Sequence, residues 1–246
     1  MGTETIPGWT HSIETGSTVD GPGIRFVLFL SGCALRCQYC HNPDSWHLKE
    51  GEKTDSAAIV SEIKQYADFL RRGHGGVTLS GGEPLVQAPF TRAVFHGCKQ
   101  LGLHTALDTS GYLGALADDD LLHDTDLVLL DIKSFNPEVY RRLTGVALAP
   151  TLTFARRLAA MNKPIWLRYV LVPGLTDNLT DVAGLAAFAA TLGSVQRVDV
   201  LPFHQLGSFK WNQRNLAYKL ADVEPPTPEL TDEVRELFRA QGFRTT

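Results

Sequence analysis

Residues 24–30 read Ile24-Arg25-Phe26-Val27-Leu28-Phe29-Leu30, a mostly apolar and β-rich run of strand length. Its single charge favours a strand buried on both faces over one with alternating polar and apolar sides. Three of the four cysteines, Cys33, Cys37 and Cys40, follow it directly. The sequence therefore predicts a buried strand that ends in a cysteine-rich loop.

The same alternation of strand and helix recurs along the chain. Further strands are predicted at 76–80, 104–108, 127–132, 165–172 and 195–201. Helical patterns are predicted at 55–72, 90–101, 137–143, 150–161 and 179–192, with a last helix after Pro228. Alternating strands and helices indicate a parallel sheet, and about six units are fewer than the eight of a closed barrel. We therefore expect an α/β fold, an incomplete (β/α)6 barrel with parallel strands.

The chain is expected to form one domain over residues 1–246. Within it, residues 1–23 are predicted to be an N-terminal lip, 24–211 the partial barrel core, and 225–246 a linker and helix. Hydrophobic residues make up 43% of the chain and charged residues 20%, which excludes a mainly disordered protein.

Charge and hydropathy narrow the class of partner. The net charge of −4 argues against a protein that binds nucleic acid over its whole surface. The first residues carry no basic or apolar leader, and no apolar run reaches membrane-spanning length. We expect a cytoplasmic protein with no nucleic-acid or membrane partner, and take a monomer as the working hypothesis.

The cysteines form a C-x₃-C-x₂-C pattern that indicates metal binding or redox chemistry in a reducing compartment. Three thiolates would leave one metal position open, because structural zinc takes four ligands and cubane clusters usually take four thiolates. Alternatives are haem attachment through Cys37 and Cys40 before His41, structural zinc with His41 or Cys98 as fourth ligand, and three buried structural cysteines. Cys98 lies in a predicted amphipathic helix, where core packing is its ordinary role.

Polar and glycine-rich motifs follow the predicted strands. Besides the cysteines, they are Gly81-Gly82-Glu83, Asp108-Thr109, Asp131-Ile132-Lys133 and Pro202-Phe203-His204. The carboxyl ends of parallel strands form one rim, where active sites of α/β proteins lie. These motifs are therefore predicted to converge on one site.

The cysteine loop after the first strand, with Ser80-Gly81-Gly82-Glu83-Pro84 after the second, resembles the radical S-adenosylmethionine (SAM) superfamily. Other stretches resemble, more narrowly, the glycyl-radical-enzyme activating enzymes. These stretches are 16–25, 39–44, 108–111, 130–133 and 201–204, so the resemblance covers most of the chain. Many such activases carry a ferredoxin-like insert with extra cysteines. This chain has none, which favours the type that acts on pyruvate formate-lyase.

The resemblance implies a mechanism. Cys33, Cys37 and Cys40 would hold a [4Fe-4S] cluster whose fourth iron is chelated by the amino and carboxylate groups of SAM. A reductant, flavodoxin or ferredoxin, would supply one electron, and cleavage of SAM would give methionine and a 5′-deoxyadenosyl radical. That radical would take a hydrogen atom from a backbone glycine of a glycyl radical enzyme, here expected to be pyruvate formate-lyase. The protein would orient these groups and exclude water.

The resemblance also assigns site residues. Gly81 and Gly82 would let the backbone approach the methionyl group, since neither has a Cβ. Asp20 in the lip would contact the glycine-bearing loop of the partner, and is grouped with the three cysteines as catalytic. A monovalent cation is expected at Asp108, Thr109 and Asp131. The full set expected to bind SAM is Tyr39, Cys40, His41, Gly81, Gly82, Glu83, Asp131, Ile132, Lys133 and His204.

Two positions depart from the family pattern, with Ser110 in place of asparagine and Phe203 in place of tyrosine. Both departures weaken the inference that this protein acts on the same substrate as the family members it resembles. Two other functions stay open: a radical SAM enzyme for a small molecule, such as a deazapurine-forming synthase, and a non-catalytic zinc or electron-transfer protein. Iron or zinc content after anaerobic reconstitution separates the latter from both enzymes.

Overall fold

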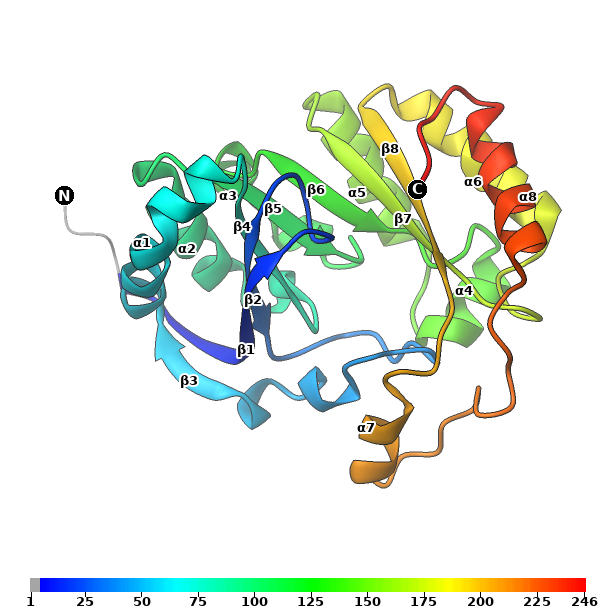
Figure 1. Cartoon of the computed structure of the whole chain (residues 1–246), viewed down its shortest axis with the longest axis horizontal. Coiled ribbons are helices and arrows are strands. Elements are labelled where there is room, and N and C mark those ends of the chain that lie inside the picture. Colours follow the sequence, from blue (N-terminus) through cyan, green and yellow to red (C-terminus); the bar gives the residue numbers. More distant parts are fainter. Residues whose placement is uncertain (1–4) are drawn as a thin grey trace. The chain divides into compact units, whose positions relative to one another are not determined.

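The computed structural model describes residues 5–246, which divide into two compact units (Figure 1). Among the described residues, unit 1 comprises 5–34, 45–109 and 113–129. Unit 2 comprises Leu35–Asp44, Ser110–Tyr112 and Leu130–Thr246. Residues 1–4 of the predicted lip lie outside the described residues. The single-domain organisation stays a prediction.

The described strands are assigned to one eight-stranded sheet. They are β1 (Pro7–Ser17), β2 (Arg25–Leu30), β3 (Glu52–Asp55), β4 (Gly76–Gly81), β5 (His104–Thr109), β6 (Leu127–Asp131), β7 (Ile165–Leu171) and β8 (Val195–Pro202). Their order is β3-β1-β2-β4-β5-β6-β7-β8, with β3 and β8 at the two edges, so the sheet is not closed. The pairs β2–β4, β4–β5 and β7–β8 are parallel. The predicted incomplete barrel is confirmed.

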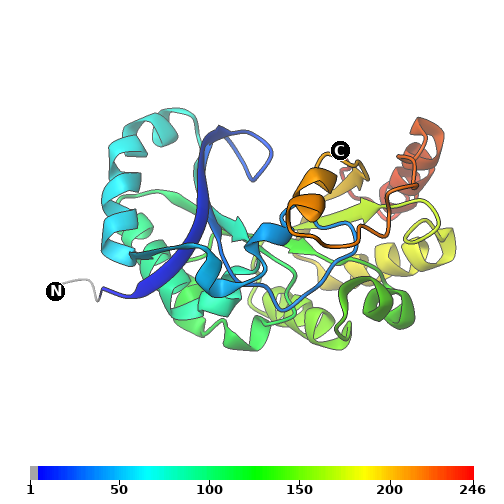
Figure 2. The same ribbon diagram turned by 90° about the horizontal axis from the view of Figure 1, so that it is seen from below.

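Helices alternate with strands along most of the chain, as the sequence predicted. They are α1 (Ser56–Arg72), α2 (Ala88–Gln100), α3 (Asp119–His123), α4 (Pro137–Thr144), α5 (Ala149–Ala160), α6 (Leu179–Leu192), α7 (Ser208–Gln213) and α8 (Pro228–Arg239). In unit 1, α1 packs against α2, and both lie on the same side of β2 and β4 (Figures 1 and 2). In unit 2, α6 packs against α8 and β8.

Helix α1 shows how the sequence sets these elements. The Asp55 carboxylate accepts a hydrogen bond of 2.8 Å from the Ala58 N–H, which satisfies one of the amide groups left unpaired at a helix start. Its buried face repeats at helical spacing through Ile59, Ile63 and Leu70.

Strand β2 is buried on both faces, as predicted from its apolar run. Phe26, Val27, Leu28 and Leu30 have no exposed surface. Arg25 at its start is equally buried, although it is charged.

The sequence analysis missed β1, β3, α3 and α7. Strand β1 pairs antiparallel with β2 and β3, and most of its residues are partly or fully exposed. Its polar side chains therefore show no clear apolar alternation. The four residues of β3 and the six of α7 are too short for a periodic pattern to stand out.

The last residues of the chain pair with the edge strand β8. The Val198 N–H donates to the Arg244 carbonyl at 2.9 Å, and the Thr246 N–H donates to the Val198 carbonyl at 3.3 Å. The Thr246 hydroxyl also donates to the Asp199 carboxylate at 2.7 Å. The C-terminal segment thus covers backbone groups that an edge strand would otherwise expose.

Candidate active site

The second half of the cysteine loop is bonded to the end of α4 in unit 2. The backbone N–H groups of Arg36 and Gln38 donate to the Thr144 and Leu143 carbonyls at 2.8 and 3.1 Å. The last carbonyls of a helix have no partner within the helix, so the loop satisfies them. These hydrogen bonds fix the path of the backbone that contains Cys37 and Cys40.

Cys40 is held from both sides. Its N–H donates to the Cys37 carbonyl at 3.1 Å, and its carbonyl accepts a 2.8 Å hydrogen bond from the Trp211 indole on α7. Cys37 is buried and Cys40 half-buried. None of the four cysteines, all of them in the described part of the chain, forms a disulfide.

Cys33 belongs to unit 1, where it lies beside the glycine motif. The Cys33 N–H donates to the Trp46 carbonyl at 3.0 Å, and the Glu83 N–H donates to the Gly32 carbonyl at 2.8 Å. The two motifs predicted to share a site are thus bonded through neighbouring backbone groups.

Gly81 and Gly82 are required by the packing of the chain itself. Gly81 has a φ of +111°, and a Cβ there would lie 2.3 Å from the Leu30 nitrogen. A Cβ on Gly82 would lie 2.4 Å from the Gly32 carbonyl oxygen. Larger residues at either position would push β4 away from the start of the cysteine loop.

The carboxylates of the unit 1 rim are hydrogen-bonded. Glu83 is 1% exposed, and its Oε1 accepts from the Thr109 hydroxyl at 2.6 Å and from the Leu85 N–H at 3.2 Å. Asp108 accepts from the Ser80 hydroxyl at 2.6 Å. Side chains from β4 and β5 therefore hold each other at the carboxyl ends of the strands.

Unit 2 brings Tyr39, Asp131 and Lys133 together. The Lys133 ammonium lies 2.9 Å from an Asp131 carboxylate oxygen and 5.8 Å from the centre of the Tyr39 ring. Burial disfavours the charged ammonium, but Asp131 outweighs it, so the pKa of Lys133 is raised. Burial raises the pKa of Tyr39 well above its ordinary value, so the phenol stays neutral. Its hydroxyl is buried and has no hydrogen-bond partner among residues 5–246, which is costly unless a ligand supplies one.

The two histidines of the predicted site stack in unit 2. The rings of His41 and His204 lie 4.3 Å apart at 26°, and His41 Nε2 lies 3.3 Å from the His204 carbonyl oxygen. Because that oxygen only accepts, His41 Nε2 carries the proton. Partial burial and His204 lower the pKa of His41, so the ring is held neutral. Ile132 lies in the core, with its N–H bonded to the Arg168 carbonyl.

Asp20 precedes β2 and is held within unit 1 by side-chain and backbone hydrogen bonds. Its carboxylate accepts from the Ser17 hydroxyl at 2.5 Å, and its carbonyl accepts from the Thr78 hydroxyl at 2.6 Å. The structure therefore bonds Asp20 to β4 at Thr78, three residues before Gly81.

Sequence reasoning missed Arg25, which anchors the Asp20 segment. The buried guanidinium donates to the Thr78 hydroxyl at 2.9 Å and to the Pro22 carbonyl at 3.4 Å. It also lies 3.2 Å from His104 Nδ1. Burial lowers the pKa of Arg25 to about 10, so it stays charged. A charge at the first position of an apolar strand was the available signal.

Three other residues discussed in the sequence analysis, Cys98, Ser110 and Phe203, are buried. Cys98 is fully buried in α2, and burial raises the pKa of its thiol to about 12. Ser110 is buried, with its carbonyl accepting from the Thr151 hydroxyl, and Phe203 is buried after β8. Among residues 5–246, no three His, Cys, Asp or Glu side chains form a ready-made metal site.

A family model described as the Radical SAM superfamily matches residues 27–186. The pyruvate formate-lyase 1-activating enzyme of Escherichia coli K12 is 41% identical over 242 residues, which are 98% of each chain. The chain belongs to the radical SAM superfamily, in the family of the pyruvate formate-lyase activating enzymes.

Another member of this activating-enzyme family, from Staphylococcus epidermidis, is 42% identical over 247 residues, covering 97% of this chain and 96% of the relative. A solved domain of a pyruvate-formate lyase-activating enzyme from Bacteroides vulgatus superposes with a TM-score of 0.59 at 25% identity. It covers 70% of this chain and 98% of that domain. The family resemblance drawn from the motifs is confirmed. Within the described residues, no helix has both the length and the apolar character needed to cross a bilayer.

Proposed function

We propose that this protein activates pyruvate formate-lyase by generating a glycyl radical on it. The observation that carries the proposal is identity of 41% over 98% of both chains with an enzyme named for that activity. When bound, the cluster and SAM supply an electron and a 5′-deoxyadenosyl radical that abstracts a glycine hydrogen. The protein must position these groups and keep water from them.

The cysteines fit a [4Fe-4S] cluster as its donor set. Thiolates are the ligands of such clusters, and Cys33, Cys37 and Cys40 are outside any disulfide. Backbone hydrogen bonds on both sides of the loop support a fixed course for its thiols. We assign these three residues as cluster ligands, with the fourth iron left for SAM.

The contacts with SAM are also proposed. Tyr39 has a buried hydroxyl without a partner, which supports a ligand beside it. Lys133 carries a positive charge that can meet the carboxylate of SAM, while Asp131 fixes its ammonium. His41 and His204 present a stacked pair of rings suited to a nucleoside. Gly81, Gly82, Glu83 and Ile132 would contribute mainly through backbone and packing.

Two further parts of the proposal concern a cation and the substrate. Asp108, Thr109 and Asp131 offer the hard oxygen ligands that a monovalent cation needs, in support of a cation beside the SAM carboxylate. Asp20, fixed by Ser17 and Thr78, is proposed to contact the glycine-bearing segment of pyruvate formate-lyase.

The physiological setting completes the proposal. The chain is proposed to act as a single domain and a monomer in the cytoplasm, with flavodoxin or ferredoxin as its one-electron donor. A reducing cytoplasm is compatible with cysteines that stay available to iron.

The test uses the anaerobically reconstituted protein with dithionite, SAM and pyruvate formate-lyase. We expect a protein-borne glycyl radical by electron paramagnetic resonance, and transfer of deuterium from the labelled glycine into 5′-deoxyadenosine. Asp20→Ala should lower that transfer while iron content and SAM affinity persist. Radical SAM cleavage that modifies a small molecule, but no glycyl radical enzyme, would overturn the proposal. Zinc in place of iron would point to a non-catalytic protein.

A further inference from the structure

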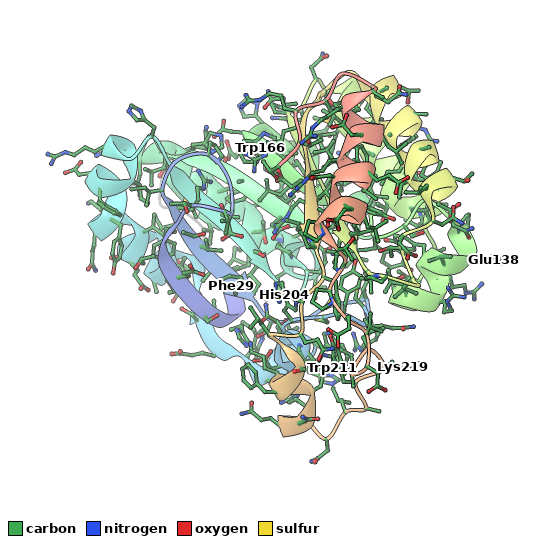
Figure 3. The ribbon with its side chains drawn as sticks, turned by 45° about the vertical axis from the view of Figure 1, so that its right-hand side comes forward. Phe29, Glu138, Trp166, His204, Trp211 and Lys219 are labelled. Atoms are coloured by element: carbon green, nitrogen blue, oxygen red, sulfur yellow. The ribbon has the colours of Figure 1, made fainter. Side chains whose placement is uncertain are left out.

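Helix α4 carries the cysteine loop at its C-terminal end and a buried tyrosine on its inner side. The Leu143 and Thr144 carbonyls accept from the backbone of the loop. The exposed Glu138 marks the outer side of α4 in Figure 3, and Tyr140, two residues further along, does not share its face. Tyr140 has no exposed surface, so its phenol lies in the interior of unit 2. The helix is therefore anchored by a buried polar side chain as well as by its contact with the loop.

The Tyr140 hydroxyl is the first of three polar groups joined by hydrogen bonds. It lies 3.0 Å from the Thr151 hydroxyl oxygen on α5, and Thr151 donates to the Ser110 carbonyl at 2.9 Å. Because a carbonyl only accepts, the single proton of the Thr151 hydroxyl is used in that bond. Tyr140 therefore donates to Thr151, and the chain of bonds runs from Tyr140 through Thr151 to Ser110.

Burial keeps the Tyr140 phenol in the form that donates. It raises the pKa of Tyr140 above its ordinary value, so the phenol stays protonated. The Cys37, Lys133 and Asp131 side chains also act on this pKa, so the phenol lies close to them within unit 2. These three residues are a proposed cluster ligand and two proposed SAM contacts.

Ser110 begins a segment, residues 110–112, that packs tightly in unit 2 and is called here the 110–112 segment. Gly111 has a φ of +69°, and a Cβ there would lie 2.8 Å from Leu130 Cδ1 and 3.1 Å from Phe154 Cδ1. Only a glycine fits that approach at this backbone angle. The segment therefore lies directly on β6 and α5.

We infer that Tyr140 is a positioning residue of the SAM site, which holds the 110–112 segment through Thr151 in a fixed place relative to the cysteine loop. This rests on the proposed function, because the segment directly follows Asp108 and Thr109, which are proposed to hold a cation beside the SAM carboxylate. One helix, α4, bonds both to the loop and to this chain of hydroxyls, so the two parts of the site share one support.

Removal of the phenol oxygen should release the 110–112 segment. The Thr151 hydroxyl would lose its donor and could rotate to another backbone carbonyl, as threonine hydroxyls in helices do. The buried Ser110 carbonyl would then lack the bond from Thr151, and the loss of a buried hydrogen bond favours a shift of the backbone toward a new partner.

The test measures the affinity of the reconstituted full-length protein for SAM by isothermal titration calorimetry. Tyr140→Phe should lower this affinity about fivefold, the size of one lost neutral hydrogen bond. Thr151→Val removes the donor to the Ser110 carbonyl and should lower it about tenfold or more. Thr151→Ser keeps the hydroxyl and should retain the affinity of the unaltered protein. The iron content of all three variants should stay the same.

Two further measurements test whether Tyr140 acts through Thr151. The double variant Tyr140→Phe with Thr151→Val should bind SAM no more weakly than Thr151→Val alone, because the two hydroxyls form one chain. Hydrogen exchange of the amides in the 110–112 segment, followed by mass spectrometry, should be faster in both single variants. Losses of affinity that multiply in the double variant would contradict the inference.

A matched control is Tyr169 on β7, which is also buried in unit 2. Its hydroxyl donates to the Thr176 carbonyl, and its ring lies 6.4 Å from Phe238 on α8. Tyr169→Phe should lower the free energy of unfolding in urea about as much as Tyr140→Phe, but leave SAM affinity and exchange in the 110–112 segment unchanged.

The outcomes separate this inference from the proposed function. Equal SAM affinity in Tyr140→Phe and the unaltered protein would overturn the inference, and so would an equal loss of affinity in Tyr169→Phe, since the role would then be stability alone. Failure of the unaltered protein to bind SAM would count against the proposed function. Hydrogen exchange would then still decide whether Tyr140 holds the 110–112 segment.

Discussion

Arg25 is buried and the neighbouring His104 is half-buried, and the Arg25 guanidinium lies 3.2 Å from His104 Nδ1. Burial, and then the Arg25 charge, lower the pKa of His104 to about 4, against an ordinary 6.5, while Asp126 opposes this and Lys99 adds to it. His104 is therefore neutral in the folded protein, and its Nδ1 can accept from Arg25.

This pair predicts a loss of stability in mild acid. Between pH 6.5 and about 4 the unfolded chain protonates His104 and the folded chain does not, so the free energy of unfolding falls as pH falls through that range. Urea unfolding at several pH values measures it. His104→Gln should flatten this part of the profile, and His47→Gln, at an exposed histidine, should not. Identical profiles for both variants would contradict the assignment.

The four cysteines should differ in their effect on iron. Cys33→Ala, Cys37→Ala and Cys40→Ala should each abolish the visible absorption of the cluster and SAM cleavage, since each removes a thiolate. Cys98→Ala should keep both and cost about 1 kcal/mol of stability, as a small truncation in the core. Iron lost from the Cys98 variant alone would exclude the proposed ligand set.

Lys133 and His204 should affect SAM binding without affecting iron. Lys133→Ala removes a charge-assisted contact and should weaken SAM binding about tenfold or more, and His204→Ala should weaken it less. Calorimetry with SAM and iron analysis measure the two properties separately. Lys64→Ala on α1 is the control. Unaltered SAM affinity in both variants would remove these residues from the site.

Helix α4 links local backbone geometry to the cysteine loop. Gly145 ends this helix at a φ of +82°, where a Cβ would meet no atom within 4 Å. Gly145→Ala should therefore cost only the backbone strain, about 1 kcal/mol in the free energy of unfolding. It should also speed iron loss to a chelator, because the Leu143 and Thr144 carbonyls hold the loop. Gly102→Ala, also at positive φ but at the end of α2, should cost similar stability and spare the iron.

The elements that could be predicted from the sequence are those in which apolar residues form a clear run or recur at regular spacing. Buried apolar strands such as β2 stand out, and so do capped helices such as α1, because burial dictates their residues. Strand β1 and helix α7 were missed because their pattern is set by pairing with β2 and by contacts with residues 40–44, which sequence does not display. The same holds for the candidate site. Its motifs were visible, whereas the Glu83–Thr109 bond and the orphaned Tyr39 hydroxyl depend on distant residues meeting.

The whole sheet is open, with β3 at one edge and β8 at the other. Strand β3 is short and polar, as edge strands that resist pairing commonly are. Strand β8 instead has its backbone bonded to residues 244 and 246. Deleting residues 244–246 should expose this edge and promote self-association, measured by light scattering. If the truncated chain scatters light no more than the full chain, residues 244–246 are not needed to protect the β8 edge from self-association.

The pairing at β8 has a practical consequence for handling the protein. An affinity tag fused after Thr246 would be joined directly to a residue that is already hydrogen-bonded. The Thr246 N–H donates to the Val198 carbonyl, and its hydroxyl donates to the Asp199 carboxylate. Such a tag would compete with those bonds or pull on them during capture on a resin. A tag joined ahead of β1 would leave them intact, and is the better choice for crystallisation and for calorimetry.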